Sequence, residues 1–246
     1  MHTMHLIGGG WRPEATPGLY GPFLASAGPD PTVATVVLDE GDGPAQADRW
    51  ARVLRSAAAC TPVPVLVPLG SRLDVAALGD ADAILVCGGL TPAYDAALAP
   101  AAQALRTWLD EGDRPYAGFS AGAAVAAARA VVGGWRSAGV EMCPQDASED
   151  LDEISLCDGL GLMPWTVDVH AAQWGTLPRL VHAVGLLGDG AAGIALDEDT
   201  AVHVGPAGQD GSGGAVVAGL GRVHVVRAVP GGALVEVRQA GDRLVP

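Results

Sequence analysis

The stretch Arg114-Pro-Tyr-Ala-Gly-Phe-Ser-Ala-Gly-Ala123 joins a short apolar segment to an alanine-rich one through Gly118-Phe119-Ser120-Ala121-Gly122. This pattern is typical of a nucleophile elbow, a sharp turn between a strand and a helix in which a serine stands clear of the backbone. The flanking glycines let the chain turn and let a substrate approach. We therefore take Ser120 as the candidate nucleophile and the N–H of Ala121, at the helix start, as a candidate oxyanion donor. The alternative is an ordinary turn with a serine cap.

Around the elbow, apolar runs alternate with helical segments, which is typical of parallel strands joined by helices. The pattern predicts strands at 4–7, 32–38, 64–67, 83–87 and 116–118. It predicts helices at 46–59, 91–111 and 121–130, with Thr91 as the N-cap of the second and a break at Pro100. The periodicity fades over 131–158, which indicates a long loop that follows the candidate nucleophile.

The second half of the chain is expected to add antiparallel structure. We predict a strand at 166–169, a helix at 177–187, and short strands at 193–196, 201–204, 215–217, 223–226 and 234–237 that pair as hairpins. The predicted fold class is therefore α/β, a mostly parallel sheet flanked by helices with C-terminal antiparallel hairpins. We expect residues 1–246 to form one domain.

Composition narrows the classes of partner. Lys+Arg 14 against Asp+Glu 28 gives a net charge of −14, which would repel nucleic acid and anionic lipid surfaces. The N-terminal residues lack the basic and apolar regions of an export signal, and no apolar run approaches the ~18 residues of a membrane span, so we expect a cytoplasmic protein. The four cysteines lack C-x-x-C spacing, which disfavours a zinc site or a disulfide framework.

A serine nucleophile needs a base, and His170 is the best candidate among six histidines. It follows an apolar strand and precedes a turn, which places it at the carboxyl end of a strand, where α/β sheets bind ligands. Glu141 is our first choice for the carboxylate that orients the base, because it is a lone acid among apolar residues. Asp168 is the rival, as orienting residue or substrate binder.

Three other patterns leave alternatives open. The paired glycines after the strand at 83–87 favour Gly89 as a second oxyanion donor, although Gly-Gly alone can be a simple turn. Gly8-Gly9-Gly10 suggests a nucleotide site, but G-x-G-x-x-G fails at Pro13. The acids within 146–153 form a solvated face by default, with binding of a cation or a basic substrate group as the alternative.

Taken in order, these segments resemble the serine peptidases of the aspartyl dipeptidase (peptidase E) and cyanophycinase family, whose core is like that of class I glutamine amidotransferases, a flavodoxin-like three-layer fold. The similar blocks are Leu6-Ile7-Gly8-Gly9-Gly10, Gly88-Gly89-Leu90-Thr91, Gly118-Phe119-Ser120-Ala121-Gly122-Ala123, Gly159-Leu160-Gly161-Leu162 leading to Asp168-Val169-His170, and Gly193-Ile194-Ala195-Leu196-Asp197-Glu198-Asp199-Thr200.

The resemblance implies Ser120 as nucleophile, His170 as general base, and Gly89 with Ala121 as oxyanion donors. Glu141 is a weaker transfer, since it only roughly matches the acid-methionine stretch of the dipeptidase branch. Candidate substrate-binding residues are Gly88, Thr91, Asp168 and Arg179. The cyanophycinase branch has several arginines after the histidine, whereas this chain keeps only Arg179 in a comparable place, so cyanophycin is disfavoured.

These predictions converge on a serine hydrolase that cleaves an amide bond in a short peptide through an acyl-enzyme, with no metal or organic cofactor. An amidase or esterase acting on a non-peptide substrate and a non-catalytic binding module are the alternatives. We expect a small peptide as partner, no nucleic acid and no membrane, with a homodimer as an option.

Overall fold

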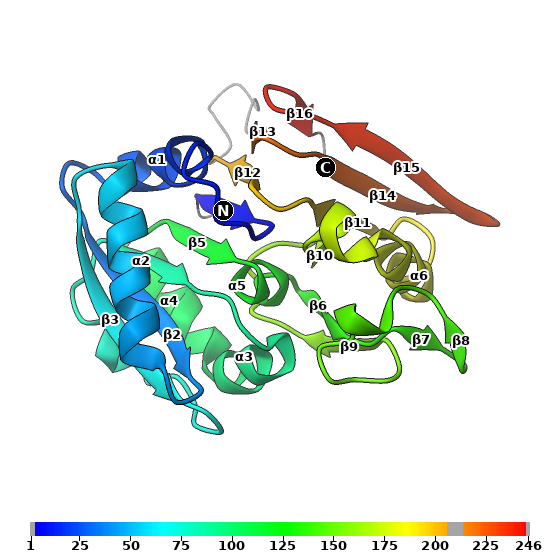
Figure 1. The fold of residues 1–246 in the computed structure, drawn as a ribbon, viewed down its shortest axis with the longest axis horizontal. Coiled ribbons are helices and arrows are strands. Elements are labelled where there is room, and N and C mark those ends of the chain that lie inside the picture. Colours follow the sequence, from blue (N-terminus) through cyan, green and yellow to red (C-terminus); the bar gives the residue numbers. More distant parts are fainter. Residues whose placement is uncertain (1–2, 206–213, 245–246) are drawn as a thin grey trace.

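The computed structural model describes residues 3–205 and 214–244, and it is built on an eight-stranded mixed sheet (Figure 1). The strand order is β16-β13-β12-β1-β5-β4-β2-β3. Neighbours from β1 to β3 run parallel, while β12, β13 and β16 add antiparallel pairs on the other side of β1. These strands are β1 (Met4–Ile7), β2 (Thr32–Asp39), β3 (Thr61–Pro68), β4 (Ala83–Val86), β5 (Tyr116–Phe119), β12 (Thr200–Val204), β13 (Ala215–Gly219) and β16 (Arg243–Leu244). The predicted α/β class is confirmed.

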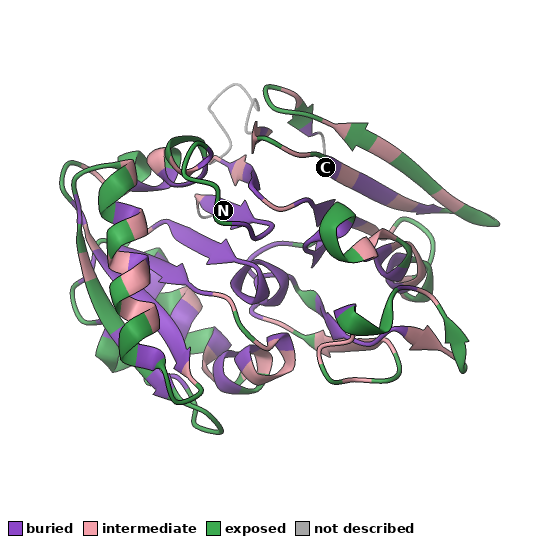
Figure 2. Ribbon diagram, in the orientation of Figure 1, coloured by how far each residue is buried: buried purple, intermediate pink, exposed green. Residues whose placement is uncertain are grey.

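Helices cover both faces of this sheet, which gives three layers. On one face, α1 (Thr16–Ser26) and α2 (Gly43–Ala57) pack against strand residues such as Ile7, Val37 and Leu85. On the other face, α3 (Thr91–Leu98), α4 (Ala102–Gly112) and α5 (Ala121–Val125) pack against Leu6 and Ile84. Figure 2 shows that β1, β4 and β5 are buried along their length, as expected of parallel strands covered on both faces.

A second sheet of four strands, in the order β10-β11-β14-β15, lies beside the first. Its strands are β10 (Thr166–Asp168), β11 (Ala192–Leu196), β14 (Val223–Val229) and β15 (Gly232–Arg238), and α6 (Leu177–Leu187) covers one face through Leu180 and Val184. The first two strands run parallel and the last two antiparallel. The predicted antiparallel C-terminal strands are therefore present, but they are divided between two sheets. The connection 206–213 lies outside the described residues.

The long alanine-rich helix predicted over 121–130 is wrong beyond Val125. After α5 the chain enters β6 (Arg129–Gly133), which pairs with β9 (Ser155–Asp158). The carbonyl groups at the end of α5 accept hydrogen bonds from another segment, since the N–H of Leu160 binds the carbonyl of Val125 and that of Leu162 binds the carbonyl of Ala126. These bonds replace the helical bonds that alanine would otherwise favour.

Two further predictions need correction. The stretch 131–158 is not an unstructured loop, because it contains β6, β9 and a hairpin formed by β7 (Arg136–Ser137) and β8 (Val140–Glu141). Thr91 is not the N-cap of α3, since Leu90 occupies that position and Thr91 is the first helical residue. The predicted break at Pro100 is present, because a short 3₁₀ turn over Ala99–Ala101 separates α3 from α4. Across the described ranges, none of the helices combines the length and apolarity needed to cross a bilayer.

Candidate active site

Ser120 occupies the turn between β5 and α5 with φ 52° and ψ −113°, a conformation that costs energy for a residue with a side chain. The glycines on either side make the turn possible. A Cβ at Gly118 would lie 2.3 Å from the carbonyl oxygen of Gly122, and a Cβ at Gly122 would lie 2.2 Å from that of Val86. The buried Tyr116 hydroxyl then donates to the Gly122 carbonyl at 2.7 Å. Ser120 is thus held in the strained backbone typical of a nucleophile elbow.

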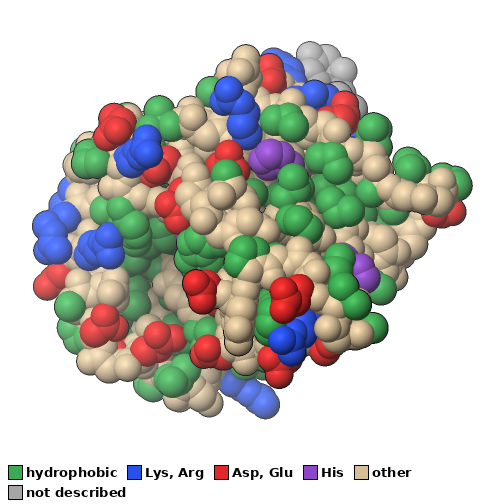
Figure 3. Space-filling model, turned by 45° about the vertical axis from the view of Figure 1, so that its right-hand side comes forward, with side chains coloured by type: hydrophobic (Ala, Val, Ile, Leu, Met, Phe, Trp, Pro, Cys, Tyr) green, Lys and Arg blue, Asp and Glu red, His purple; other side chains and the backbone are tan. Residues whose placement is uncertain are grey.

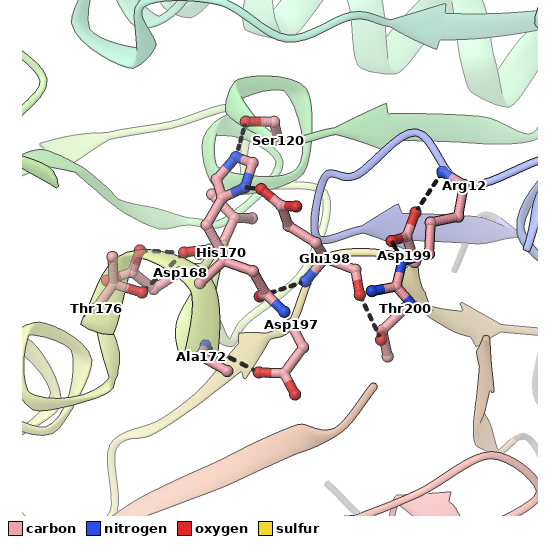
Figure 4. Close-up of polar contacts among 12 residues, drawn as sticks. Arg12, Ser120, Asp168, His170, Ala172, Thr176, Asp197, Glu198, Asp199 and Thr200 are labelled. Atoms are coloured by element: carbon pink, nitrogen blue, oxygen red, sulfur yellow. Dashed lines mark hydrogen bonds and ion pairs between the residues drawn. The ribbon is translucent and has the colours of Figure 1, made fainter. Parts of the chain in front are cut away.

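The side chain of Ser120 meets His170, which in turn meets an acid (Figure 4). Ser120 Oγ lies 2.7 Å from His170 Nε2, and His170 Nδ1 lies 2.8 Å from Glu198 Oε1. The serine and the histidine are each 6% exposed, while the Glu198 side chain is 29% exposed. This is the geometry in which an imidazole takes a serine proton while a carboxylate fixes its tautomer.

Backbone contacts to the end of β1 bring His170 and the acid together. His170 follows β10 in a left-handed conformation with φ 55°, and its N–H donates to the carbonyl of Gly8 at 3.1 Å. The N–H of Asp199 donates to the carbonyl of Gly9 at 2.8 Å. A Cβ at Gly9 would lie 2.1 Å from Cε1 of His170, so this position must be glycine for the imidazole to fit. The glycine run after β1 therefore makes room for the histidine.

Burial lowers the pKa of His170 from its ordinary value of 6.5, and this effect outweighs the hydrogen bond and the charge of Glu198, both of which raise the pKa. A pKa below 6.5 favours the neutral form of the imidazole at pH 7. A neutral imidazole can accept the proton of Ser120, which a general base must do.

Gly89 and Ala121, the residues expected to supply oxyanion-binding N–H groups, both lie beside Ser120. The N–H of Ala121 is the first of α5 and, like the others of a first helical turn, has no partner within its own helix. Gly89 follows β4, which is hydrogen-bonded to β5, and Gly89 lines the same cavity as Ser120. A Cβ at the neighbouring Gly88 would lie 2.9 Å from the Cβ of Ser120, so glycine is needed for this loop to approach the serine.

A cavity of about 400 Å³ opens over these groups. Its described lining includes Ser120, His170, Gly88 and Gly89, together with the side chains of Trp11 and Trp174. The Trp174 ring stacks on the His170 imidazole at 3.9 Å between centroids and 9° between planes. This stacking restricts rotation of the imidazole, and Trp174 remains 39% exposed where it lines the cavity.

The structure does not bring Glu141 to His170. Glu141 lies in the exposed β7–β8 hairpin, opposite Arg136, and among the described residues it makes no hydrogen bond or ion pair with the histidine. The hairpin turns at Ala138 and Gly139, both of which have positive φ. The choice of Glu141 as orienting acid therefore needs correction to Glu198.

Asp168 and Arg179, proposed as substrate binders, form a buried pair instead. Arg179 Nε and Nη2 donate to the two Asp168 oxygens at 2.9 and 2.7 Å, and the side chains of Arg179 and Asp168 are 3% and 2% exposed. Arg179 Nη1 donates to the carbonyls of Gly134 and Ala147. Thr91 is also buried, and its N–H donates to Glu149 Oε2 at 2.9 Å. Of the four predicted binders, only Gly88 lines the cavity.

Glu198 was missed because its neighbours hide its role. It lies in the acidic run Asp197-Glu198-Asp199, which reads as an exposed turn. The available signal was position, since the run follows the apolar segment 193–196 and would lie at a strand end. Because the carboxyl ends of β10 and β11 are adjacent in parallel register, His170 and Glu198 lie side by side. In the described part of the chain, no three His, Cys, Asp or Glu side chains are grouped as metal ligands would be.

Fold and site together define the class of protein: a three-layer α/β protein with a serine, a histidine and a carboxylate at the carboxyl ends of its strands. No protein-family model matches the chain, and no curated protein sequence matches it. Among solved structures, the chain is similar to a "Putative Peptidase E Protein" from Listeria monocytogenes EGD-e, with a TM-score of 0.52 and 14% identity over 89% of this chain and 99% of that one. The peptidase E-like fold implied by the sequence resemblance is therefore confirmed.

Proposed function

We propose that this protein is a serine hydrolase that cleaves an amide bond in a short peptide through an acyl-enzyme. The observation that carries the proposal is the continuous chain of contacts from Ser120 Oγ to His170 and on to Glu198. It is supported by the strained elbow and by the cavity that opens over the serine. The peptidase E-like fold adds support for a peptide as the substrate class.

In the proposed reaction, Ser120 Oγ attacks the carbonyl carbon while its proton passes to His170 Nε2. The carbonyl oxygen becomes an oxyanion that accepts hydrogen bonds from the N–H groups of Gly89 and Ala121. Collapse of the tetrahedral intermediate breaks the C–N bond, and His170 gives its proton to the leaving amine. Water then repeats the sequence on the acyl ester, which releases the acid and restores Ser120. Glu198 holds the Nδ1 proton throughout and stabilises the imidazolium.

A fluorophosphonate probe tests this proposal without knowledge of the substrate, because it reacts with an activated serine. We expect the probe to label the wild-type protein at Ser120 and to label neither Ser120→Ala nor His170→Ala. Ser26→Ala is a matched control, since that serine ends α1, donates to the carbonyl of Phe23 and is not among the described residues that line the cavity. Absence of labelling in the folded wild-type protein would refute the proposal and favour a non-catalytic binding module.

Mass-spectrometric profiling of dipeptides and tripeptides then separates a peptidase from an amidase or esterase. We expect peptide cleavage that is lost in Ser120→Ala. His170→Ala and the Ser120→Ala/His170→Ala double variant should lose about as much activity as Ser120→Ala, because members of one catalytic unit are non-additive. Probe labelling without turnover of any peptide, combined with hydrolysis of small esters or amides, would favour the second class.

A further inference from the structure

The cavity over Ser120 is lined by three acidic side chains, Asp146, Glu149 and Asp150. Neither lysine nor arginine is present among the described residues that line it. Figure 3 shows acidic side chains spread over a hollowed face of the molecule, and the whole chain carries a net charge of −14. The electrostatic potential in such a cavity attracts cations and opposes acidic substrates.

Two of these carboxylates are free to meet a ligand. Asp146 and Asp150 are exposed, and neither makes a hydrogen bond or an ion pair with another residue in the described ranges. Glu149 differs, because its Oε2 accepts the N–H of Thr91 at the start of α3. Glu149 therefore joins the acidic segment to the loop that carries Gly89, while Asp146 and Asp150 remain unpaired beside the cavity.

The buried side chain of Arg179 holds the backbone of the acidic segment near Asp146 in place. Arg179 donates to the carbonyls of Gly134 and Ala147, on either side of the hairpin, and is itself fixed by both oxygens of Asp168. A guanidinium held in this way cannot serve as a substrate binder, but it sets the position of residues 145–147. The backbone that carries Asp146 is therefore held by the protein interior.

Aromatic rings complete the surroundings of these acids. Trp11 and Trp174 both line the cavity and are 42% and 39% exposed, which is unusual for the largest apolar side chain. One face of Trp11 already carries the guanidinium of Arg49, at 3.4 Å from the ring centroid. Exposed indole rings beside unpaired carboxylates are the chemistry that binds ammonium and guanidinium groups.

We propose that the substrate carries a positive charge close to the scissile carbonyl, which Asp146 and Asp150 bind beside Trp174. The chemical class is an ammonium or guanidinium group, present either as a free α-amino group or as a lysine or arginine side chain. The assignment rests on the proposed hydrolase function, and it opposes the anionic aspartyl substrates that the sequence resemblance suggests.

The test compares cleavage of peptides that differ only in charge. One arm pairs lysine with acetyl-lysine at the same position, and the other pairs a free with an acetylated amino terminus. We expect kcat/KM to be about tenfold higher for the cationic member of at least one pair at low salt, and the difference to shrink at high salt. The arm that shows the preference identifies the source of the charge. Equal rates in both pairs, or faster cleavage of a glutamate peptide, would overturn the proposal.

Substitution of Asp146 and Asp150 tests whether these two carboxylates cause the preference for cationic peptides. In Asp146→Asn/Asp150→Asn, we expect the ratio of kcat/KM for the cationic peptide to kcat/KM for the acetylated peptide to fall to about one. A melting temperature shows that the variant is folded. Glu141→Gln is the matched control, because it removes an exposed carboxylate of the same region that does not line the cavity, and we expect it to keep the wild-type ratio. An unchanged ratio in the double variant would exclude these two carboxylates.

Protection from the fluorophosphonate separates failure of this inference from failure of the proposed function. At least one cationic amide, either N-acetyl-lysinamide or norleucinamide with its free α-amino group, should protect Ser120 at about tenfold lower concentration than N-acetyl-norleucinamide. If the probe labels Ser120 and all three amides protect equally, the charge preference fails and the hydrolase stands. If the probe does not label Ser120, the hydrolase and the preference that rests on it both fail.

Discussion

The three consecutive acids after β11 have three separate partners, and this division selects Glu198. Asp197 Oδ1 accepts the N–H of Ala172, and Asp199 Oδ1 accepts the N–H of Arg12, both at 3.0 Å. Only the middle residue is left to face the imidazole. The outer acids therefore fix the turn, and the turn aims Glu198 at His170 Nδ1.

Replacing Glu198 by glutamine should separate its charge from its shape. The amide still reaches Nδ1, but it no longer stabilises the imidazolium or secures the tautomer, so we expect kcat/KM to fall by about a thousandfold. Steady-state assays on the best peptide of the library measure this fall. Glu141→Gln should leave the rate unchanged, because that acid lies in the exposed hairpin away from His170. A rate for Glu198→Gln within threefold of wild type would count against the role of Glu198.

The pH dependence of kcat/KM is a second test of the contact between His170 and Glu198. The proposed reaction needs a neutral His170, and burial lowers the pKa of His170 below 6.5, so kcat/KM should be constant near neutrality and fall only below pH 6.5. Glu198 raises the pKa of His170, hence Glu198→Gln should lower that pKa further and move the acid limb to lower pH. A limb that moves to higher pH in the variant would contradict this assignment.

Gly9 and Gly41 offer a matched pair of glycine substitutions. Both have strongly positive φ, 109° and 117°, but a Cβ at Gly9 would lie 2.1 Å from His170, whereas a Cβ at Gly41 meets nothing within 4 Å. Gly41→Ala should therefore cost only backbone strain, about 1 kcal/mol in urea unfolding, and keep its activity. Gly9→Ala should be less stable and should lose probe labelling at Ser120, because the imidazole must move. Full labelling of Gly9→Ala would disprove the steric argument.

At the scale of elements, the sequence predicted what depends on local pattern. β1, β2, β4, β5 and α6 lie where apolar runs and turn residues place them, because a buried parallel strand must be apolar on both faces. β3 begins three residues before the predicted strand at 64–67, because it is a largely exposed edge strand whose first residues lack an apolar pattern. The helix α1 was not predicted, since Gly18, Gly21 and Pro22 are poor helix formers and packing of Leu19, Phe23 and Leu24 stabilises it. The end of α5 also depends on distant hydrogen bonds, from residues 160–162, that no local pattern contains.

The residues of the candidate site likewise divide into those that a local pattern predicts and those that depend on contacts distant in sequence. Ser120, Gly88 and Gly89 belong to short local motifs, and His170 lies at a recognisable strand end. The partner of His170 depends on the parallel register of β10 with β11, two strands separated in sequence by α6, so spacing alone could not distinguish Glu198 from Glu141.

The buried pair that joins β10 to α6 should be an important stabilising contact between elements. Asp168→Asn leaves Arg179 buried with an uncompensated charge, and we expect the free energy of unfolding to fall by about 3–5 kcal/mol. Arg129 and Asp158 form an exposed pair between β6 and β9, so Asp158→Asn is the matched control and should cost less than about 1 kcal/mol. Urea unfolding followed by circular dichroism compares the two. Equal losses would show that the buried pair has no special structural role.

Across the whole molecule, the candidate site lies where the carboxyl ends of strands from both sheets meet. Gly9 follows β1, Gly89 follows β4 and Ser120 follows β5 in the large sheet, while His170 and Glu198 follow β10 and β11 in the small one. The contact between Ser120 and His170 therefore joins the two sheets, which lie side by side in Figure 1. Docking of the two sheets fixes the distance from serine to histidine, so conditions that loosen the large sheet should also affect the site.

A histidine pair in the large sheet makes low pH one such condition. His5 in β1 and His203 in β12 are direct neighbours in register, with their Nδ1 atoms 2.8 Å apart, and His5 Nε2 lies 3.2 Å from Ser26 Oγ of α1. Burial, and then the charge of His203, lower the pKa of His5 to about 3, and burial lowers the pKa of His203. Two protonated imidazoles cannot share this contact, because both nitrogens would be donors.

Acid should therefore destabilise the fold through this pair. Both pKa values are lower in the folded protein than in the unfolded chain, so their contribution is complete above pH 6.5 and is lost as the pH falls from 6.5 toward 3. Between pH 7.5 and 4.5 we expect wild type to lose about 2 kcal/mol more unfolding free energy than His5→Gln, in which the larger titration is absent. Urea unfolding of both proteins at the two pH values measures the difference, and the comparison cancels any loss that His5→Gln causes at pH 7.5. If the two proteins lost equal stability, acid sensitivity would have to arise from other buried groups, among them His170.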